Sequence, residues 1–194
     1  MPLLTVFGGP NGSGKSSVIR KMEFEGRENL LDTDAIAKRM DPANPRRAAV
    51  AAGREVILRT REYLGNQQSF AIETTLSSRS SLTTICEAQE RGFIVHLVYV
   101  CVNTPERSIQ RVRERVTEGG HDVPEEDVRR RYVRSLQNLP AVLLQAHKAV
   151  VYDNSDDEPR KVLETQAGII VWRADCETAW VTRVCEIISS KEPT

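Results

Sequence analysis

The sequence lacks the features that would place the protein on a membrane, on nucleic acid or outside the cell. Its 27 basic residues balance 27 acidic ones, so no overall charge attracts it to nucleic acid or to anionic lipid. No apolar run is long enough to span a bilayer, and the N-terminus leads directly into a short apolar segment, which leaves no room for a signal peptide. We therefore expect a cytoplasmic protein with neither a membrane nor a nucleic acid as its partner.

Cysteine and lysine are both scarce. The four cysteines form no C-x-x-C pair: Cys86, Cys101, Cys176 and Cys185. They sit among apolar residues, which is typical of buried thiols in a reducing compartment and argues against a metal site. Lysine contributes 6 residues against 21 arginines. Because arginine is always charged and forms paired hydrogen bonds with phosphate, this bias favours a phosphate ligand.

One complete phosphate-binding motif, G-x-x-x-x-G-K-[ST], is present. It consists of Gly9, Pro10, Asn11, Gly12, Ser13, Gly14, Lys15 and Ser16. The apolar run Leu3–Phe7 before it predicts a buried strand, and the helical spacing of apolar residues in Ser17–Phe24 predicts a helix after it. The alternative is a glycine-rich turn that binds nothing, and the full motif with both flanks disfavours it. The sequence predicts that the chain binds a nucleoside triphosphate.

Each residue type in this motif has a chemical role. Glycines let backbone N–H groups turn toward the phosphates, and the N-terminus of the following helix adds its positive end. Lys15 can reach the β- and γ-phosphates, and the hydroxyl of Ser16 can ligate Mg²⁺. We expect residues 9–17, with Ser17 as the last, to bind ATP, and Ser16 to be the metal ligand.

Short apolar runs alternate with helical patterns along the chain. The runs are Leu3–Phe7, Leu30–Leu31, Phe70–Ile72, Phe93–Val102, Ala149–Tyr152 and Ile169–Trp172. This alternation predicts a mostly parallel sheet with helices on both faces, the three-layer α/β fold of P-loop NTPases and kinases. Ligands of such sheets bind at the carboxyl ends of the strands, where Asp34, Glu73, Asn103 and the pair Asp153–Asn154 are found.

The length of 194 residues suits one domain with a sizeable core and a small lid. A helix is predicted over Ala48–Leu64. Pro105 and Pro124 each open a further helix, with Gly119 and Gly120 between them. Because an arginine-rich helix–loop–helix is typical of the lid of a small P-loop kinase, we expect residues 1–194 to form a single kinase domain with a lid at about 105–140.

Eight arginines cluster in this predicted lid: Arg107, Arg111, Arg113, Arg115, Arg129, Arg130, Arg131 and Arg134. Most are expected on solvated helix faces beside acids, where each exposed pair contributes about 0–1 kcal/mol. One or two that face the P-loop are enough to neutralise the γ-phosphate. Arg115 and Arg131 are the candidates because they flank the lid loop, one on each helix. His121, in that loop, can touch a phosphate or make a loop hydrogen bond.

Three acids are candidates for the acceptor side of the reaction. Asp32 and Asp34 follow the second apolar run. There an aspartate can act as the base that orients an acceptor hydroxyl, or it can cap the helix that begins at Ala35, and both roles stay open. Glu73 closes the third run, where a buried acid needs a partner. It can hold Mg²⁺ through water or hydrogen-bond a sugar hydroxyl.

Other nucleotide-binding signatures are weak or missing. Val150–Asp153 matches the Walker B pattern only loosely and can instead lie near the adenine, together with Asn154. The sequence has no Asn-Lys-x-Asp motif, which argues against a GTPase. It has no Asp-Glu pair at the end of an apolar run either, which argues against a mechanical ATPase of the AAA type.

Taken together, the motifs resemble the zeta-toxin family of P-loop kinases. The matching blocks are Gly9–Ser17, Asp34–Ala37 (DAIA), Phe70–Ser77 (FAIETTLS), Arg111–Leu139 and Tyr152–Ser155. Very many proteins share the P-loop, but Glu-Thr-Thr-Leu-Ser combined with a Gly-Gly-His-x-Val-Pro lid is much more specific. The resemblance samples residues 3 to 155, and the segment after about residue 160 adds nothing diagnostic.

The resemblance implies ATP- and Mg²⁺-dependent phosphorylation of UDP-N-acetylglucosamine on a hydroxyl of its amino sugar. Asp34 would occupy the position of the base, and Lys15, Arg115 and Arg131 would neutralise the triphosphate. Toxins of this family are usually silenced by a small helical antitoxin that blocks the ATP site. A partner of that kind is therefore a candidate here.

One departure from the family pattern concerns the acceptor. By resemblance, Glu73 and Thr75 would contact the sugar nucleotide, but the arginine that follows the Glu-x-Thr-Leu block in the toxins is replaced by Ser77, with Arg79 two residues further on. Kinase chemistry is unaffected, and other acceptors stay open: nucleosides, small metabolites and nucleic-acid ends. A module that hydrolyses ATP slowly and signals to a partner is the alternative from a different class.

Overall fold

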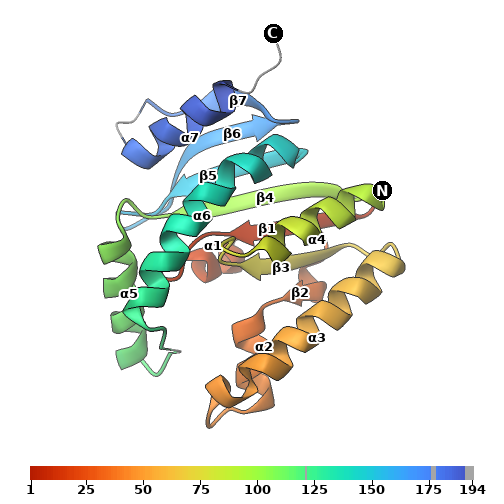
Figure 1. Cartoon of the computed structure of the whole chain (residues 1–194), viewed down its shortest axis with the longest axis vertical. Helices are drawn as coiled ribbons and strands as arrows, with labels where there is room; N and C mark the ends of the chain where they lie inside the picture. Colours follow the sequence, from red (N-terminus) through yellow and green to blue (C-terminus); the bar gives the residue numbers. More distant parts are fainter. Residues whose placement is uncertain (121, 176–177, 191–194) are drawn as a thin grey trace.

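The computed structural model describes residues 1–120, 122–175 and 178–190 (Figure 1). Within these ranges seven strands form one sheet in the order β2-β3-β1-β4-β5-β6-β7. Their bounds are β1 Leu3–Gly8, β2 Leu30–Leu31, β3 Phe70–Thr74, β4 Ile94–Cys101, β5 Lys148–Asp153, β6 Arg160–Gln166 and β7 Ile169–Arg173. The first five strands pair in parallel, whereas β6 and β7 are antiparallel to their neighbours. The predicted mostly parallel sheet is confirmed.

Strand β6 is absent from the sequence prediction. Its residues include the charged Arg160, Lys161 and Glu164, and an irregularity between Glu164 and Thr165 breaks the alternation of its side chains. Without an unbroken period-two pattern or an apolar run, the segment gives little signal of a strand. Its pairing with β5 supplies the order that its sequence does not reveal.

Helices surround the sheet, among them those predicted after the P-loop, near Ala35, over Ala48–Leu64 and from Pro105 and Pro124. The bounds are α1 Lys15–Lys21, α2 Thr33–Met40, α3 Pro45–Gly65, α4 Arg79–Glu90, α5 Pro105–Thr117, α6 Glu125–Gln145 and α7 Ala179–Ser189, with a 3₁₀ turn at Arg27–Asn29. Helix α3 starts earlier than the predicted Ala48 because Pro45 occupies its first turn, where a missing N–H costs nothing. Helix α5 starts at Pro105, as predicted, and Thr104 caps it.

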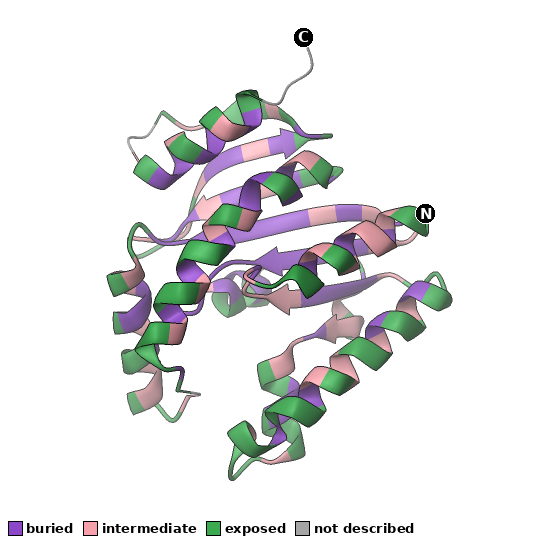
Figure 2. Cartoon of the chain, in the orientation of Figure 1, coloured by how far each residue is buried: buried purple, intermediate pink, exposed green. Residues whose placement is uncertain are grey.

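Helices cover both faces of the sheet. Helices α4, α6 and α7 lie on one face, and their buried side chains pack with those of the sheet in the main core (Figures 1 and 2). On the other face, Val18 and Ile19 of α1 pack against Phe7 and Val98. Burying a side chain of this size contributes about 1.5–3 kcal/mol. This confirms the three-layer α/β fold of the P-loop kinase class.

Two helical pairs extend beyond the sheet. Helices α2 and α3 pack on each other beside β2, and α5 packs on the first half of α6 (Figure 1). Helix α6 is tied to β4 by two buried hydrogen bonds. The Tyr132 hydroxyl donates to the Val102 carbonyl at 2.8 Å, and the hydroxyls of Tyr99 and Ser135 lie 3.0 Å apart. These bonds place α6 next to the carboxyl ends of the central strands.

The cysteines follow the expected burial as far as they are described. Cys101 and Cys185 are buried and Cys86 is half-buried, whereas Cys176 and His121 lie outside the described residues. Burial raises the pKa of the Cys101 thiol to about 12, so this thiol is protonated and inert. Over the described ranges, none of the helices combines the length and the apolarity that a membrane span requires.

Candidate active site

The P-loop connects the end of β1 to the start of α1. Its glycines Gly9, Gly12 and Gly14 have φ angles of 144°, 72° and 95°, in the region that residues with a side chain rarely adopt. A Cβ at Gly12 would clash with the Ser108 carbonyl, and one at Gly14 would clash with the Asn154 amide. The glycines are therefore required twice, for the turn and for the close approach of neighbouring segments.

Lys15 is buried at the floor of the site. Its ammonium donates to the carbonyls of Gly9 at 2.8 Å and Pro10 at 3.1 Å, and lies 3.8 Å from Glu73 Oε1. Burial lowers the pKa of Lys15, while the nearby charges of Glu73 and Asp34 oppose the shift. A cation that is held by backbone carbonyls in a buried position is ready to exchange them for phosphate oxygens.

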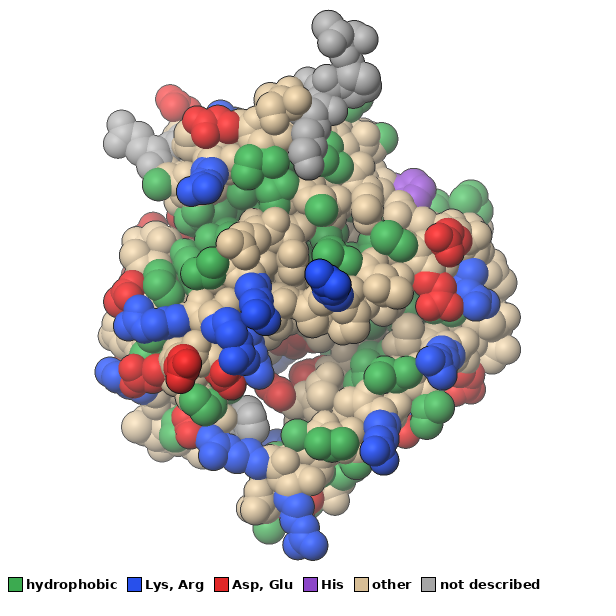
Figure 3. Space-filling model, in the orientation of Figure 1, with side chains coloured by type: hydrophobic (Ala, Val, Ile, Leu, Met, Phe, Trp, Pro, Cys, Tyr) green, Lys and Arg blue, Asp and Glu red, His purple; other side chains and the backbone are tan. Residues whose placement is uncertain are grey.

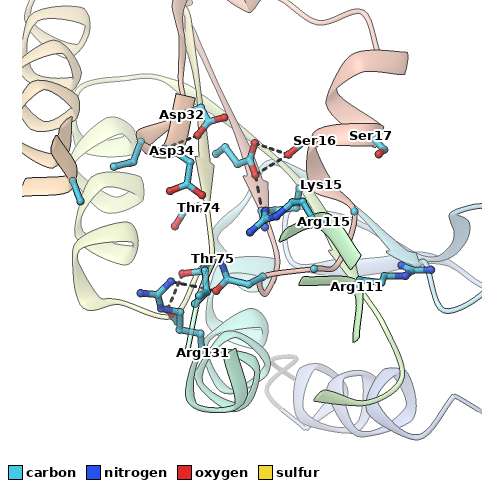
Figure 4. A pocket seen from close by; sticks show the side chains of 18 of the residues that line it. Lys15, Ser16, Ser17, Asp32, Asp34, Thr74, Thr75, Arg111, Arg115 and Arg131 are labelled. Atoms are coloured by element: carbon cyan, nitrogen blue, oxygen red, sulfur yellow. Dashed lines mark hydrogen bonds and ion pairs between the residues drawn. The ribbon is translucent and has the colours of Figure 1, made fainter. Parts of the chain in front are cut away.

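Glu73 faces the lysine and the following serine. The Ser16 hydroxyl donates toward both carboxylate oxygens of Glu73 at 3.4 Å (Figure 4). Burial raises the pKa of Glu73, and Lys15 opposes the shift. A hydroxyl and a carboxylate beside a phosphate-binding loop supply the oxygen ligands that Mg²⁺ prefers, directly or through water. The residues present thus fit a magnesium ion.

Because the folded-state pKa of Glu73 is raised, its ionisation weakens folding. Between the ordinary value of 4.5 and the raised pKa, the folded chain binds more protons than the unfolded one, so the free energy of unfolding falls as pH rises. Glu73→Gln lacks this titration. We expect the free energy of unfolding of the variant, relative to the wild type, to increase with pH over this window, as measured by urea unfolding. Glu62→Gln, an exposed acid on α3, is the control, and a pH-independent difference for Glu73→Gln would contradict the assignment.

The structure separates the two roles that stayed open for Asp32 and Asp34. The Asp32 carboxylate accepts hydrogen bonds from the backbone N–H groups of Asp34 at 2.9 Å and Ala35 at 3.1 Å, so Asp32 caps α2. Asp34 occupies the first turn of that helix, is exposed and lines the same cavity as Lys15. Because Asp32 is the cap, the Asp34 carboxylate has no capping role and can contact a substrate in the cavity.

A cavity of about 770 Å³ lies at the carboxyl ends of β1 and β3, between the α2–α3 pair and the α5–α6 pair. Figure 3 shows the molecule hollowed at this place, with acidic and basic side chains around the opening. The lining residues are Asn11, Gly12, Gly14, Lys15, Ser16, Ser17, Arg20, Asp32, Thr33, Asp34, Ala49, Glu73, Thr74, Thr75, Ser77, Ser78, Arg111, Arg115, Glu118, Val123 and Arg131. The P-loop, Asp34, Glu73 and three arginines of the predicted lid thus share one volume.

The eight lid arginines divide between surface and cavity. Arg113, Arg129 and Arg130 pair with the acids Glu125, Glu106 and Asp127. In contrast, Arg111, Arg115 and Arg131 line the cavity, and the Arg131 guanidinium donates to Asn11 Oδ1 of the P-loop at 3.3 Å. Of the triplet 129–131, the residue that lines the cavity is Arg131, the predicted member. Arg111 is an additional lining residue that was not selected.

The segment after β3 presents hydroxyl groups to the cavity. Leu76, buried and with φ of 55°, makes the turn that places Thr75 and Ser77 side by side, their hydroxyls 2.8 Å apart. The Asn138 amide of α6 donates to the Leu76 carbonyl at 2.9 Å and holds this turn. Arg79, the residue considered as a substitute for the missing arginine, begins α4 and lies outside the cavity lining.

Asn154 supports the P-loop from behind. Its side-chain amide donates to the Ser13 carbonyl at 2.8 Å and packs against Gly14, and it lines a second cavity of about 420 Å³ on the outer side of the loop. Arg20, Lys21, Arg111, Asp157 and Pro159 contribute to the same cavity, which adjoins the first one at Gly14 and Ser17. Asp153 is buried, accepts from Ser155 and Thr178 and lies outside both cavities, which argues against a Walker B role.

We expect Asn154→Ala to destabilise the fold by about 1–3 kcal/mol, because the buried Ser13 carbonyl loses its hydrogen-bond donor. The distorted loop should also bind ATP more weakly. Thermal unfolding and ATP titration measure the two effects. Asn103→Ala, an exposed asparagine at the end of the neighbouring strand β4, is the matched control. Equal stability of both variants would contradict the supporting role of Asn154.

Comparison with known proteins places this site in a family. A family model described as AAA domain (AAA_33), a P-loop kinase-like domain, matches residues 4–139, which is more than half of the chain. The chain belongs to the AAA_33 family. The matched range contains the P-loop, the acidic residues of the cavity, all of α5 and the part of α6 that carries Arg131. An uncharacterized protein of Haemophilus influenzae is 38% identical to this AAA_33 chain over 124 residues, 64% of this chain and 88% of the relative.

Solved structures show the same fold at low sequence identity. A structure of the AvrRxo1-ORF1:AvrRxo1-ORF2 complex with sulphate ions matches all of this AAA_33 chain with a TM-score of 0.72 and 16% identity. The same complex has been crystallised with ATP. Our chain spans 65% of the length of the chain it matches there. A chain from a structure of the PezAT chromosomal toxin-antitoxin system of Streptococcus pneumoniae also matches. The match covers 98% of this chain and 87% of that chain, with a TM-score of 0.58 and 16% identity.

Proposed function

We propose that this AAA_33 chain is an ATP- and Mg²⁺-dependent phosphotransferase of the zeta-toxin type that phosphorylates a hydroxyl group of a small molecule. The observation that supports this proposal most directly is the shared cavity. It brings the P-loop residues Lys15 and Ser16, three arginines of α5 and α6 and the carboxylate of Asp34, which does not cap α2, around one volume. A loop that holds phosphates and a base that faces the same space are the two parts that phosphoryl transfer requires.

The residues would divide the work as follows. The backbone of residues 9–17 and Lys15 would hold the triphosphate, with Arg115 and Arg131 neutralising its charge. Ser16 and Glu73 would hold Mg²⁺, which supplies further positive charge to the phosphate oxygens. Asp34 would accept the proton of the acceptor hydroxyl as its oxygen bonds to the γ-phosphorus. The bond from the γ-phosphorus to the bridging oxygen then breaks, and ADP leaves.

Helices α5 and α6 would serve as the lid of a single kinase domain spanning residues 1–194. Three observations support this assignment. The two helices form one wall of the cavity, carry three of its four arginines, and contact the P-loop through the bond between Arg131 and Asn11. Closure of such a wall over bound nucleotide excludes water from the γ-phosphate. Asn154 would act near the nucleotide from the second cavity.

The resemblance names UDP-N-acetylglucosamine as the acceptor, with Glu73 and Thr75 against it, and this compound is the reference acceptor to assay. A small helical antitoxin is the corresponding proposal for a protein partner. The AvrRxo1 structure is of a complex of two proteins and the PezAT structure concerns a toxin-antitoxin system, which supports assaying a protein partner. An ATP-dependent reaction of this kind also agrees with the expected cytoplasmic location.

The test of the proposed function is whether ATP consumption depends on a hydroxyl compound. ADP release is measured with Mg²⁺ and ATP alone, and then with a pool of nucleotide sugars, free sugars, nucleosides and an oligonucleotide. A kinase releases ADP well above background only when its acceptor is present. If no compound in a broad pool raises the rate above the background, the chain is instead a slow ATPase module that signals to a partner.

A further inference from the structure

Resting on the proposed phosphotransfer, we propose that the acceptor is a polyhydroxy compound that carries no phosphate group, such as a free sugar, amino sugar or cyclitol. The inference comes from how charge is distributed around the main cavity. One of its walls, which we call the hydroxyl wall, consists of Asp32, Thr33, Asp34, Thr74, Thr75, Ser77 and Ser78. It comes from the start of α2 and the segment at the end of β3.

The hydroxyl wall offers five hydroxyl groups and two carboxylates, and none of these seven residues is basic. Asp32 and Asp34 lie together on this side of the cavity in the close-up, next to Thr74 (Figure 4). Carboxylates and hydroxyls accept hydrogen bonds from sugar hydroxyls and from ammonium groups. The same carboxylates repel the negative charge of a phosphate.

Three cations of the cavity donate to partners outside the hydroxyl wall, in the P-loop or in the segment after β5. Lys15 donates to the loop carbonyls, and Arg111 donates to the Asp156 carbonyl at 3.1 Å. Arg131 lies where the two walls meet, and its guanidinium donates to Asn11 of the P-loop. We therefore assign these groups to the phosphates of ATP and the hydroxyl wall to the acceptor.

The overall charge of the cavity also favours an acceptor without a phosphate group. Five basic side chains line it, Lys15, Arg20, Arg111, Arg115 and Arg131, together with four acidic ones, Asp32, Asp34, Glu73 and Glu118. These side chains leave a surplus of one positive charge. Mg·ATP carries a net charge of roughly −2 at neutral pH, so its negative charge alone is larger than this surplus. A phosphorylated acceptor would add negative charge to a cavity with no cation left to neutralise it, whereas a neutral or amine-bearing acceptor would not.

The hydroxyls of the wall keep capacity for a ligand. The Thr75 and Ser77 hydroxyls bond to each other, and Thr74 bonds to Ser81 at 2.8 Å. Because a hydroxyl has one donor and two acceptor positions, each pair retains hydrogen-bonding capacity, even though the Thr74 hydroxyl also accepts from the Leu76 N–H at 3.1 Å. The turn at Leu76, held by Asn138, fixes the spacing of these hydroxyls. A row of fixed hydroxyls suits a ligand with several hydroxyls of its own.

Ser77 occupies the position at which the zeta-toxin pattern has an arginine, and Arg79 lies outside the cavity. The cation that would contact the diphosphate of a sugar nucleotide is thus absent from the hydroxyl wall. In its place stands a small hydroxyl that bonds to Thr75. The replacement changes which acceptors bind and leaves the ATP side intact.

The experiment uses matched pairs of acceptors that differ in phosphate. N-acetylglucosamine is paired with UDP-N-acetylglucosamine, glucosamine with glucosamine 6-phosphate, and adenosine with AMP, each assayed for label from γ-labelled ATP. We expect the phosphate-free member of at least one pair to be phosphorylated, with kcat/KM about tenfold or more above its phosphorylated partner. An equal or higher kcat/KM for phosphorylated members would overturn the inference and leave the proposed kinase standing. If ATP binds but no acceptor is labelled, the proposed function fails, and this inference fails with it.

A substitution in the hydroxyl wall tests whether its lack of a cation determines the preference for acceptors without phosphate. Ser77→Arg restores a cation, and we expect it to shift the kcat/KM ratio within a pair about tenfold toward the phosphorylated member. Ser189→Arg adds the same charge at an exposed position of α7, outside the cavity, and should leave the ratio unchanged. Thermal unfolding shows whether each variant is folded. A folded Ser77→Arg variant with the wild-type ratio would contradict the inference.

Discussion

Asp34→Asn is expected to lower the rate of phosphotransfer by about 10²–10⁴-fold while ATP binds as before. The variant keeps the size of the side chain but removes the base that accepts the acceptor's proton. Asp34 is not the cap of α2, because Asp32 fills that role, so the helix should retain its stability. Single-turnover transfer at saturating ATP, together with an ATP titration, measures the two quantities.

The control for this prediction is Asp41→Asn at the other end of the same helix. Asp41 accepts a hydrogen bond from the Asn44 backbone N–H at 2.9 Å, and an asparagine can retain it. We expect Asp41→Asn to behave as the wild type. Full turnover of Asp34→Asn would show that the base is another group, and equal losses in both variants would indicate a defect of α2.

Lys15→Ala is expected to reduce kcat by about 10²–10³-fold, the usual effect of removing one preorganised group that stabilises the transferred charge. Lys15 is the buried cation of the P-loop, and its charge holds down the pKa of Glu73, which should rise further without it. The ATP affinity should fall as well, because the triphosphate loses a direct ion pair. Initial rates over a range of ATP concentrations measure both changes.

Lys38→Ala, an exposed lysine on α2, controls for the loss of a lysine. Lys15→Arg distinguishes charge from shape, since the planar guanidinium is a poor substitute for a compact ammonium in a closed loop. We expect little recovery from it. A Lys15→Ala variant with wild-type kcat would remove the P-loop lysine from the mechanism.

The sequence allowed the central part of this site to be predicted because those features are local. The P-loop combines a motif, a preceding strand and a following helix, and all three signals lie within about 20 residues. The positions after apolar runs indicated Asp34 and Glu73 because strand ends in a parallel sheet meet at one edge. Both residues line the cavity.

Other features depend on tertiary contacts and could not be read from the sequence. Asp32 and Asp34 are equally good helix caps by type, and only the backbone geometry at Asp32 decides between them. Arg129, Arg130 and Arg131 are consecutive, so their side chains point about 100° apart around the helix axis. A small error in the predicted register therefore changes which of them faces the cavity and which faces solvent. Segment β6 forms a strand because it pairs with β5, and its own charged sequence does not predict this pairing.

The most direct test of the account follows the γ-phosphoryl group itself. The chain is incubated with Mg²⁺, γ-labelled ATP and the mixed acceptor pool, and labelled phosphate esters are separated from inorganic phosphate. The account predicts label in an ester for the wild type and its near absence for Asp34→Asn and Lys15→Ala. Label that appears only as inorganic phosphate, at the same rate with and without acceptors, would contradict phosphotransfer to a hydroxyl.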